Sequence, residues 1–136
     1  MNQNKFTHKS QEALQKAQGL VFDMNHTHME PVHLLFALLE QEEGLTTPLF
    51  QKLGVNVQLV KNNLLKRLEA RPKVNLDSNT AQIYLSPEMA RVLHQAEKEA
   101  AKLKDDFISV EHLILAILNI PGEASKLLEQ FYINSL

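Results

Sequence analysis

The sequence predicts an all-α fold in which two pseudo-symmetric copies of one helical repeat pack into a single globular domain. Apolar residues recur at steps of three and four along nearly the whole chain, which is the spacing of one helix face. A seven-residue motif starts at position 33 and returns at position 112, an offset of 79 residues. The 136 residues suffice for one hydrophobic core and are too few for two independent ones.

Two helices are expected before Gly44. The first starts after Thr7, whose hydroxyl can accept a hydrogen bond from a free backbone N–H of the first turn. Its apolar stripe consists of Ala13, Leu14, Ala17, Val21 and Met24. Pro31 suits the first turn of the second helix, where its missing N–H costs nothing, and Gly44 marks the end of that helix.

Two further helices follow in the first half of the chain. Thr47-Pro48 has the form of a cap and a first helical position, and Gly54 closes this short helix. The next helix begins after Asn56 and continues to about Arg71, because the proline that follows disfavours helical backbone.

The second half opens with a polar segment and then repeats the same signals. The segment, at about 72–84, carries turn residues and predicts a linker within the domain. Ser86-Pro87-Glu88 combines a cap, a first-turn proline and an acid that the helix dipole favours. Ser109 starts the next helix and Pro121-Gly122 ends it, so that a last helix covers roughly 123–131.

The repeat sets the organisation of the domain. In the motif at 33–39 and 112–118, four of the seven aligned pairs are identical and the other three exchange one apolar residue for another. The same offset superposes Thr7 on Ser86, Leu14 on Leu93, Ala17 on Ala96, Met24 on Leu103 and Met29 on Ile108. We assign copy one to about 5–71, the linker to about 72–84 and copy two to about 85–136 of a single domain, 1–136.

The repeat also predicts that the chain is a fragment. Copy one continues past Asn56 into a helix that ends near Arg71. Copy two stops at Leu136, just after the matching Asn134. We therefore expect the last helix of copy two to be missing.

Composition excludes several classes of function. The 14 Lys and Arg against 16 Asp and Glu give a net charge of −2, without the basic excess of a nucleic-acid binder. None of the four glycines precedes a lysine, so the phosphate-binding loop of an NTPase is absent. The lack of cysteine, of a signal peptide and of an apolar run near the roughly 20 residues of a membrane span predicts a soluble, cytoplasmic domain.

The six histidines invite a metal site, but the sequence does not support one. His26 and His28 are expected on the surface before a helix, and no cysteine or well-spaced carboxylate completes a closed site. His33 and His112 recur at matching positions among leucines. We expect each to be half-buried, with its ring N–H donated to a backbone carbonyl.

No catalytic residues are expected either. The serines lie at caps or in loops rather than on a tight glycine-flanked turn. The side chains of the adjacent acids Asp105-Asp106 and Glu42-Glu43 point apart. The charged run Glu97-Lys98-Glu99 is expected to be solvated helix surface.

Two equivalent helical halves packed face to face create a two-fold seam. Such a seam can leave a groove lined by side chains that neither core uses, although any single leucine could equally be core. A groove of this kind suits an apolar helix or an extended apolar peptide.

Three segments carry a resemblance to a known family. They are Phe6-Thr7 with Ser10 to Leu14, Glu30 to Leu35, and Asp105 to Leu113. Together they resemble the Clp N-terminal repeat domain, over about 5–134, and within it the sequence is most similar to the N-domains of the ClpB family of bacterial AAA+ disaggregases.

The resemblance implies a substrate-binding module that captures apolar segments of aggregated or unfolded proteins and passes them to two ATPase rings. The alternative is an adaptor-docking domain, as in the ClpA and ClpC relatives. It implies a monomeric, non-catalytic domain without a cofactor of its own. ATP and magnesium, assembly into a homohexamer and a co-chaperone system of the DnaK type are implied for the full-length protein.

The resemblance also points to five residues. Thr7, Asp105 and Glu111 match family positions that matter for substrate handling, and Leu93 matches an apolar groove residue. His112 stands where the family has a second groove leucine, which would make this groove more polar. Thr7, Asp105 and Glu111 also have structural readings, as a helix cap, a turn residue and a first-turn acid.

Overall fold

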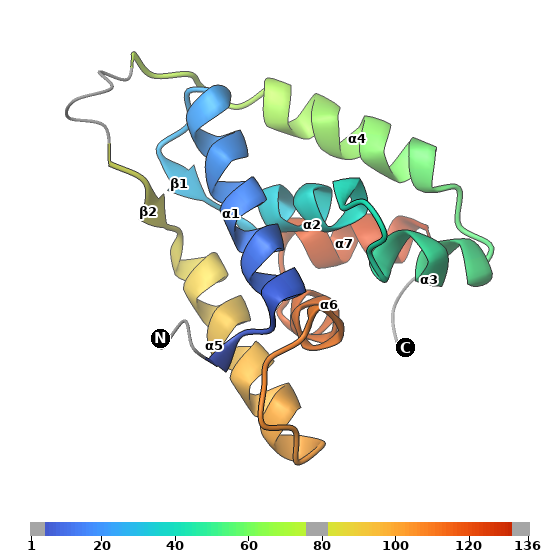
Figure 1. Cartoon of the computed structure of the whole chain (residues 1–136). Coiled ribbons are helices and arrows are strands. Elements are labelled where there is room, and N and C mark those ends of the chain that lie inside the picture. The colour runs from blue at the N-terminus through green and yellow to red at the C-terminus, as the bar shows by residue number, and fades with distance from the viewer. Residues whose placement is uncertain (1–4, 76–81, 132–136) are drawn as a thin grey trace.

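Seven helices and two short strands make up the described residues, 5–75 and 82–131, of the computed structural model (Figure 1). They are α1 (His8–Asp23), β1 (His28–Met29), α2 (Pro31–Glu40), α3 (Thr46–Lys52), α4 (Val57–Glu69), β2 (Tyr84–Leu85), α5 (Pro87–Lys102), α6 (Val110–Asn119) and α7 (Glu123–Gln130). The all-α fold is confirmed. None of the helices in these residues is long and apolar enough to cross a membrane.

The first helix of each copy begins with the same cap. The Thr7 hydroxyl accepts a hydrogen bond from the backbone N–H of Ser10 (3.2 Å) at the start of α1. The Ser86 hydroxyl accepts one from Met89 (3.0 Å) at the start of α5. Each bond satisfies one of the backbone donors that a helix start leaves open, and both caps match the sequence prediction.

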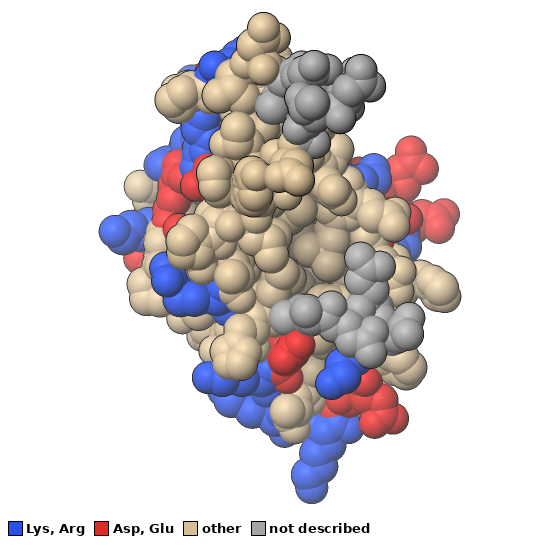
Figure 2. Space-filling view, turned by 90° about the vertical axis from the view of Figure 1, so that its left-hand side faces the viewer, with Lys and Arg blue, Asp and Glu red and all other residues tan. Residues whose placement is uncertain are grey.

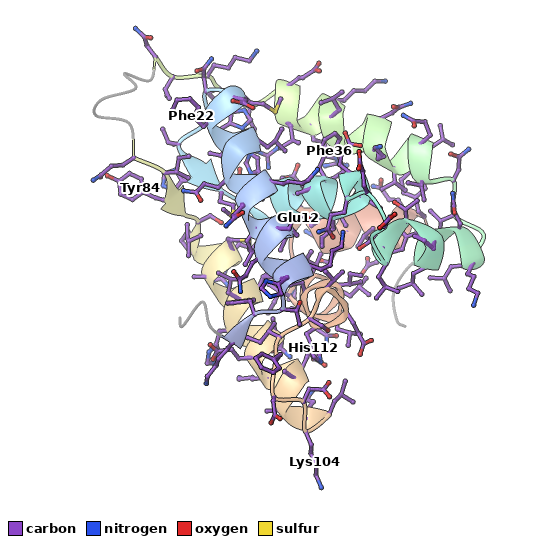
Figure 3. All side chains as sticks on the ribbon, viewed as in Figure 1. Glu12, Phe22, Phe36, Tyr84, Lys104 and His112 are labelled. Atoms are coloured by element: carbon purple, nitrogen blue, oxygen red, sulfur yellow. The ribbon has the colours of Figure 1, made fainter. Side chains whose placement is uncertain are left out.

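These two helices also end in the same way. Asn25 (φ 59°) and Lys104 (φ 57°) take the left-handed conformation just after the helix cap residue. The next backbone N–H, of His26 and of Asp105, donates to the carbonyl oxygen five residues earlier, at 2.9 Å in both copies. This closing motif reverses the chain and brings His26 and Asp105 within hydrogen-bond distance of His33 and His112. Lys104 itself is exposed at the end of α5 (Figure 3).

The repeated seven-residue motif forms the two central helices, α2 and α6. A helix that is apolar on nearly all sides must be buried, and Leu34, Leu35 and Leu38 of α2 are fully buried. So are Leu113 and Ile114 of α6. α1 packs on α2 and α5 packs on α6, while α2 also contacts α4, α6 and α7.

Short parallel pairings cross between the copies. β1 pairs with β2, with Met29 opposite Leu85, and an isolated bridge joins Phe6 to Ile108. The repeat offset relates these two pairings, because Leu85 corresponds to Phe6 and Ile108 to Met29. In each case the segment before the first helix of one copy lies beside the segment before the second helix of the other. The sequence did not predict these strands.

Equivalent hydrogen bonds hold both crossings. The backbone N–H of Thr7 donates to the carbonyl of Ile108, and that of Ser86 donates to the carbonyl of Met29, both at 3.0 Å. The cap residue of each first helix is therefore bound to the opposite copy.

Several helix boundaries differ from the prediction. α2 ends at Glu40 rather than near Gly44, because Gln41 already has extended backbone (ψ 131°). Thr47 does not cap α3, since its hydroxyl donates to the carbonyl of Leu39 (3.0 Å). Residues 76–81 of the expected linker and any counterpart of α4 in copy two lie outside the described residues.

Glu99 was expected on solvated surface, and that prediction is wrong. It is 7% exposed and lies between α5 and α6, where its Oε1 accepts hydrogen bonds from Gln95 and Asn119, both at 2.8 Å. The bond from Gln95 lowers the pKa of Glu99, with a further contribution from Asn119 and opposition from burial.

The left-handed backbone at Lys104 makes a stability prediction. A side chain with a Cβ pays about 1 kcal/mol in this conformation, so Lys104→Gly should raise the free energy of unfolding by about that amount. Urea unfolding with an unchanged m-value measures it. The control is Lys98→Gly on the exposed side of α5, which should lose about 1 kcal/mol. A loss in both variants would contradict the account.

Candidate functional site

A groove opens between α1 and α5, beside the crossed pairings. Its apolar lining consists of Phe6, Leu14, Met29, Leu85 and Leu93, around about 280 Å³ of open volume. Phe6 and Leu85 are repeat partners, as are Leu14 and Leu93. The groove therefore lies on the seam between the two copies and takes two pairs of equivalent side chains from them.

One lip of the groove is polar but uncharged. Gln11, Gln15 and Gln18 follow one another along α1 on the groove side, and the Gln11 amide nitrogen donates to the carbonyl of Phe6 (2.9 Å). Among the described residues, no charged side chain lines the groove. Figure 2 shows the face that carries β2 and α5, with its centre free of Lys, Arg, Asp and Glu and the charged side chains at its margins.

A larger hollow, of about 510 Å³, runs along α4. Its lining mixes the exposed Leu59 and Leu65 with Asn62, Lys66 and Glu69. It lies away from the seam and has none of the sequence-predicted site residues, so the groove is the better candidate site.

The structure brings Asp105, Glu111 and His112 together at the start of α6. Nε2 of His112 lies 2.8 Å from Oδ2 of Asp105, and one oxygen or nitrogen from each of the three side chains lies within 4.8 Å of the others. Glu111 is exposed in the first turn of α6, where the helix dipole favours an acid.

The hydrogen bonds of His112 determine which ring nitrogen carries the proton. The backbone N–H of Ser109 donates to Nδ1 at 2.8 Å, so Nδ1 keeps its lone pair and the proton is on Nε2. Nε2–H then donates to Asp105. A metal ligand needs an unprotonated ring nitrogen, and here that nitrogen is occupied by a backbone donor. The cluster is therefore a hydrogen-bonded group rather than a set of metal ligands.

The predicted site residues fall into three places. Leu93 lines the groove as expected, although only 9% of it is exposed. Thr7 is the cap of α1, next to the groove residue Phe6. Asp105 and Glu111 lie in the polar cluster. The expectation that His112 lines the groove is wrong, because its ring is 2% exposed and turned toward Asp105.

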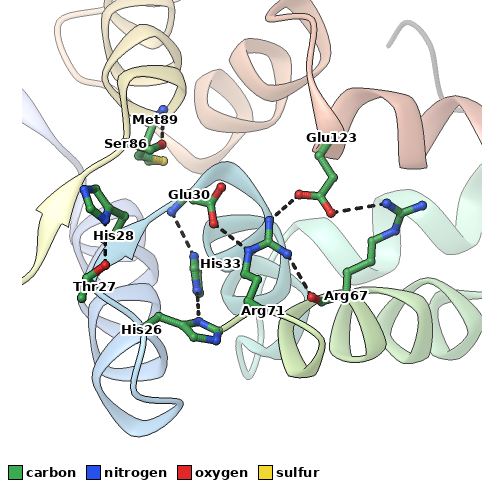
Figure 4. A network of polar contacts seen from close by, with 10 residues as sticks. All are labelled: His26, Thr27, His28, Glu30, His33, Arg67, Arg71, Ser86, Met89 and Glu123. Atoms are coloured by element: carbon green, nitrogen blue, oxygen red, sulfur yellow. Dashed lines mark hydrogen bonds and ion pairs between the residues drawn. The ribbon is translucent and has the colours of Figure 1, made fainter. Parts of the chain in front are cut away.

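The same arrangement recurs in copy one, with a different partner (Figure 4). The backbone N–H of Glu30 donates to Nδ1 of His33 at 3.0 Å, and Nε2 of His33 lies 2.9 Å from Nδ1 of His26. His26 is 4% exposed, so the prediction of a surface histidine is wrong, whereas His28 is exposed. For both repeat histidines the predicted bond from the ring to a backbone carbonyl is also wrong, since the ring accepts from a backbone N–H instead.

Arg71, which follows α4, forms hydrogen bonds with residues of three helices near His26 and His33. Its guanidinium donates to Glu30 at the start of α2 (2.6 Å), to Glu123 of α7, and to the carbonyl of Arg67 in α4 (3.0 Å). Burial opposes both charges, but the pairing lowers the pKa of Glu123 and, mainly through Glu30, raises the pKa of Arg71.

Sequence reasoning missed most of the groove. Leu14 could have been found, because the repeat offset carries Leu93 back to it. Leu85 follows from Phe6 by the same offset, once Phe6 is known to line the groove. Met29 gave no such signal, because its place depends on the crossed pairing of β1 with β2. The three glutamines of α1 gave none either.

The comparisons with known proteins come from sequence and from structure. A family model described as "Clp repeat (R) N-terminal domain" matches residues 5–131. The chaperone protein ClpB of Bacillus anthracis is 37% identical over 134 residues, which are 98% of this chain and 16% of that protein. The chain thus spans about a sixth of the length of this relative.

Two solved structures share the fold. The Hsp104 N-terminal domain from Candida albicans superposes with a TM-score of 0.82 at 18% identity, covering 94% of this chain and 82% of that one. A ClpV N-domain in complex with a VipB peptide superposes with a TM-score of 0.77 at 20% identity, covering 94% and 79%.

The cap at Thr7 predicts a stability effect separate from any role in binding. Thr7→Val keeps the shape of the side chain but removes the acceptor for the Ser10 N–H, so the free energy of unfolding should fall by about 1 kcal/mol. Thr7→Ser keeps the acceptor and should stay within about 0.5 kcal/mol of the parent. Chemical denaturation compares the two. Equal stability of the valine and serine variants would mean that the cap contributes nothing.

Proposed function

The chain belongs to the Clp repeat (R) N-terminal domain family, and from that premise we propose that it is the substrate-binding N-terminal module of a ClpB-like, ATP-dependent protein disaggregase. It captures apolar segments of aggregated or unfolded proteins in the groove and passes them to the AAA+ rings. The observation that carries the proposal is the uncharged, apolar groove on the seam between the copies. The module itself is non-catalytic. ATP, magnesium, the homohexamer, a cytoplasmic location and a DnaK-type co-chaperone belong to the proposal for the whole protein.

The size of the groove makes binding weak. Burial of an apolar side chain contributes about 1.5–3 kcal/mol, and the groove has room for only a few such side chains. Loss of translational and rotational freedom offsets much of this gain. One module therefore binds with low affinity, and several modules on one oligomer gain through avidity.

The glutamine lip makes binding tolerant of sequence. An amide both donates and accepts hydrogen bonds, so Gln15 and Gln18 can bond the backbone of an extended segment whatever its side chains are. Without a charge in the lining, the groove rejects neither acidic nor basic neighbours of an apolar residue.

The alternative function, docking of a folded adaptor, has a surface of its own. Phe107 is 55% exposed next to Asp105, and Glu111 is exposed beside them. A mixed apolar and charged surface of this kind is typical of interfaces with folded partners. It lies outside the groove, so the two functions predict different footprints.

The proposal predicts where an unfolded segment binds. Titration of the labelled domain with a short unstructured peptide rich in Leu and Phe should shift amide NMR signals of Leu14, Leu85 and Leu93. Leu85→Gln changes an exposed groove residue (48% exposed) and should weaken binding about fivefold, the equivalent of about 1 kcal/mol.

The matched control is Leu103→Gln, an exposed leucine (53%) that does not line the groove, and it should leave the affinity unchanged. Shifts confined to Asp105, Phe107 and Glu111, with equal affinity of both variants, would favour adaptor docking. No shifts at millimolar peptide would sink the proposed groove.

A further inference from the structure

The two copies place different residues at one equivalent position. His26 and Asp105 are repeat partners, both following a left-handed residue, and each accepts the Nε2–H of the repeat histidine of its own copy. The distances are 2.9 Å for His33 to His26 and 2.8 Å for His112 to Asp105. We call His26 and His33 the histidine pair.

The hydrogen bonds of the histidine pair leave no place for an extra proton. The backbone N–H of Glu30 donates to Nδ1 of His33, so the proton of His33 is on Nε2 and points at Nδ1 of His26. A further proton on either Nδ1 would face an N–H donor at about hydrogen-bond distance. One of the two bonds must then break.

The surroundings of the pair also disfavour added charge. Both rings are buried, and Arg71 and Lys73 oppose a positive charge on His26 while Glu30 favours one. The carboxylate of Glu30 is already bound to Arg71, whose other carboxylate partner is Glu123. The carboxylates near the pair are thus occupied by Arg71.

Asp105 responds differently from His26. Its side chain is 47% exposed, and a carboxyl group keeps an acceptor oxygen whether or not it is protonated. The Nε2–H of His112 therefore has an acceptor in either form of Asp105. A proton on Nδ1 of His26, in contrast, removes the acceptor for the Nε2–H of His33.

The histidine pair is joined to one wall of the groove. His26 lies just before β1, whose Met29 lines the groove opposite Leu85. The backbone N–H of Tyr84 donates to the carbonyl of Thr27 at 2.9 Å. The other crossing, Phe6 with Ile108, follows Asp105 in the same way.

We propose that the histidine pair is an acid-sensitive switch: gain of one proton breaks the bond between His26 and His33 and loosens the β1–β2 wall of the groove, while the Phe6–Ile108 crossing stays closed. The switch rests on the geometry of the pair. Only its effect on peptide capture rests on the proposed function.

The direction of the pH dependence follows from the shift of the histidines. Burial, then the neighbouring His26, lowers the pKa of His33 from 6.5 to about 4. Unfolded histidine gains its proton as the pH falls through about 6.5, whereas folded His33 gains one only near pH 4. The contribution of His33 to stability is thus complete above about pH 6.5 and is lost between there and pH 4. At pH 5 this loss lowers the folding constant by about 30-fold.

Carboxylates affect the stability of the fold at a lower pH than the histidine pair does. The lowered pKa values of Glu99 and Glu123 mean that their stabilisation is lost only as the pH falls below about 4.5. A comparison of pH 7 with pH 5 therefore lies above the window of these carboxylates, and the amide of Thr7 reports the His112–Asp105 copy for comparison.

Two measurements on the unaltered domain test the switch without any peptide. Ring ¹⁵N shifts should show His33 and His26 as Nε2–H tautomers at pH 7. Hydrogen exchange, corrected for intrinsic rates, should show at least a tenfold loss of protection at pH 5 for the amides of Tyr84 and Ser86 and none beyond threefold for Thr7, whose acceptor is Ile108. Equal loss at all three amides, no loss, or an Nδ1–H tautomer of His33 would overturn the proposal.

Exchange of the two partners between copies sharpens the test. His26→Asp gives copy one the acceptor of copy two and should abolish the extra exchange at Tyr84 and Ser86. Asp105→His should make Thr7 lose protection at pH 5 as well. If either variant fails to fold, the tautomers and exchange pattern of the unaltered domain still decide. Weaker peptide binding at pH 5 without selective exchange at Tyr84 and Ser86 would count against the switch while leaving the groove assignment intact.

Discussion

The structure depends on one hydrogen bond that is made twice. At the start of α2 and of α6, the backbone N–H of the cap residue donates to Nδ1 of the histidine three residues later. This bond leaves the ring proton on Nε2, and Nε2–H binds the residue that follows the preceding helix. The segment between these two residues carries the strand that crosses to the other copy. The orientation of His33 and His112 therefore determines where the crossings lie, and with them the groove.

The groove is a consequence of duplication. Each copy alone would offer one apolar residue from its first helix and one from the segment before it. Packing of the copies places Leu14, Leu93, Phe6 and Leu85 around one groove, so that a shared apolar lining results from two half-sites. None of the residues that line the groove is charged. A lining of this composition discriminates by apolar character rather than by charge.

Local signals in the sequence predicted the helices well. The features that were not predicted depend on contacts between residues far apart in the sequence. Thr7 and Ser86 were identified as caps because a cap bond spans only three residues. β1 and β2 have two residues each, too few to show an alternating pattern. The burial of Glu99 depends on Asn119, and the partners of the repeat histidines depend on the closing motif of the preceding helix. The spacing of apolar residues predicts none of these contacts.

The crossed pairing has a consequence for synthesis on the ribosome. Phe6 and Thr7 are made about a hundred residues before their backbone partner, Ile108. Copy one cannot complete its N-terminal edge until most of copy two has emerged. Contacts between residues so far apart in sequence slow folding, because a long loop must close before they form. The domain therefore completes its fold only after most of both copies have been made, as one unit rather than copy by copy.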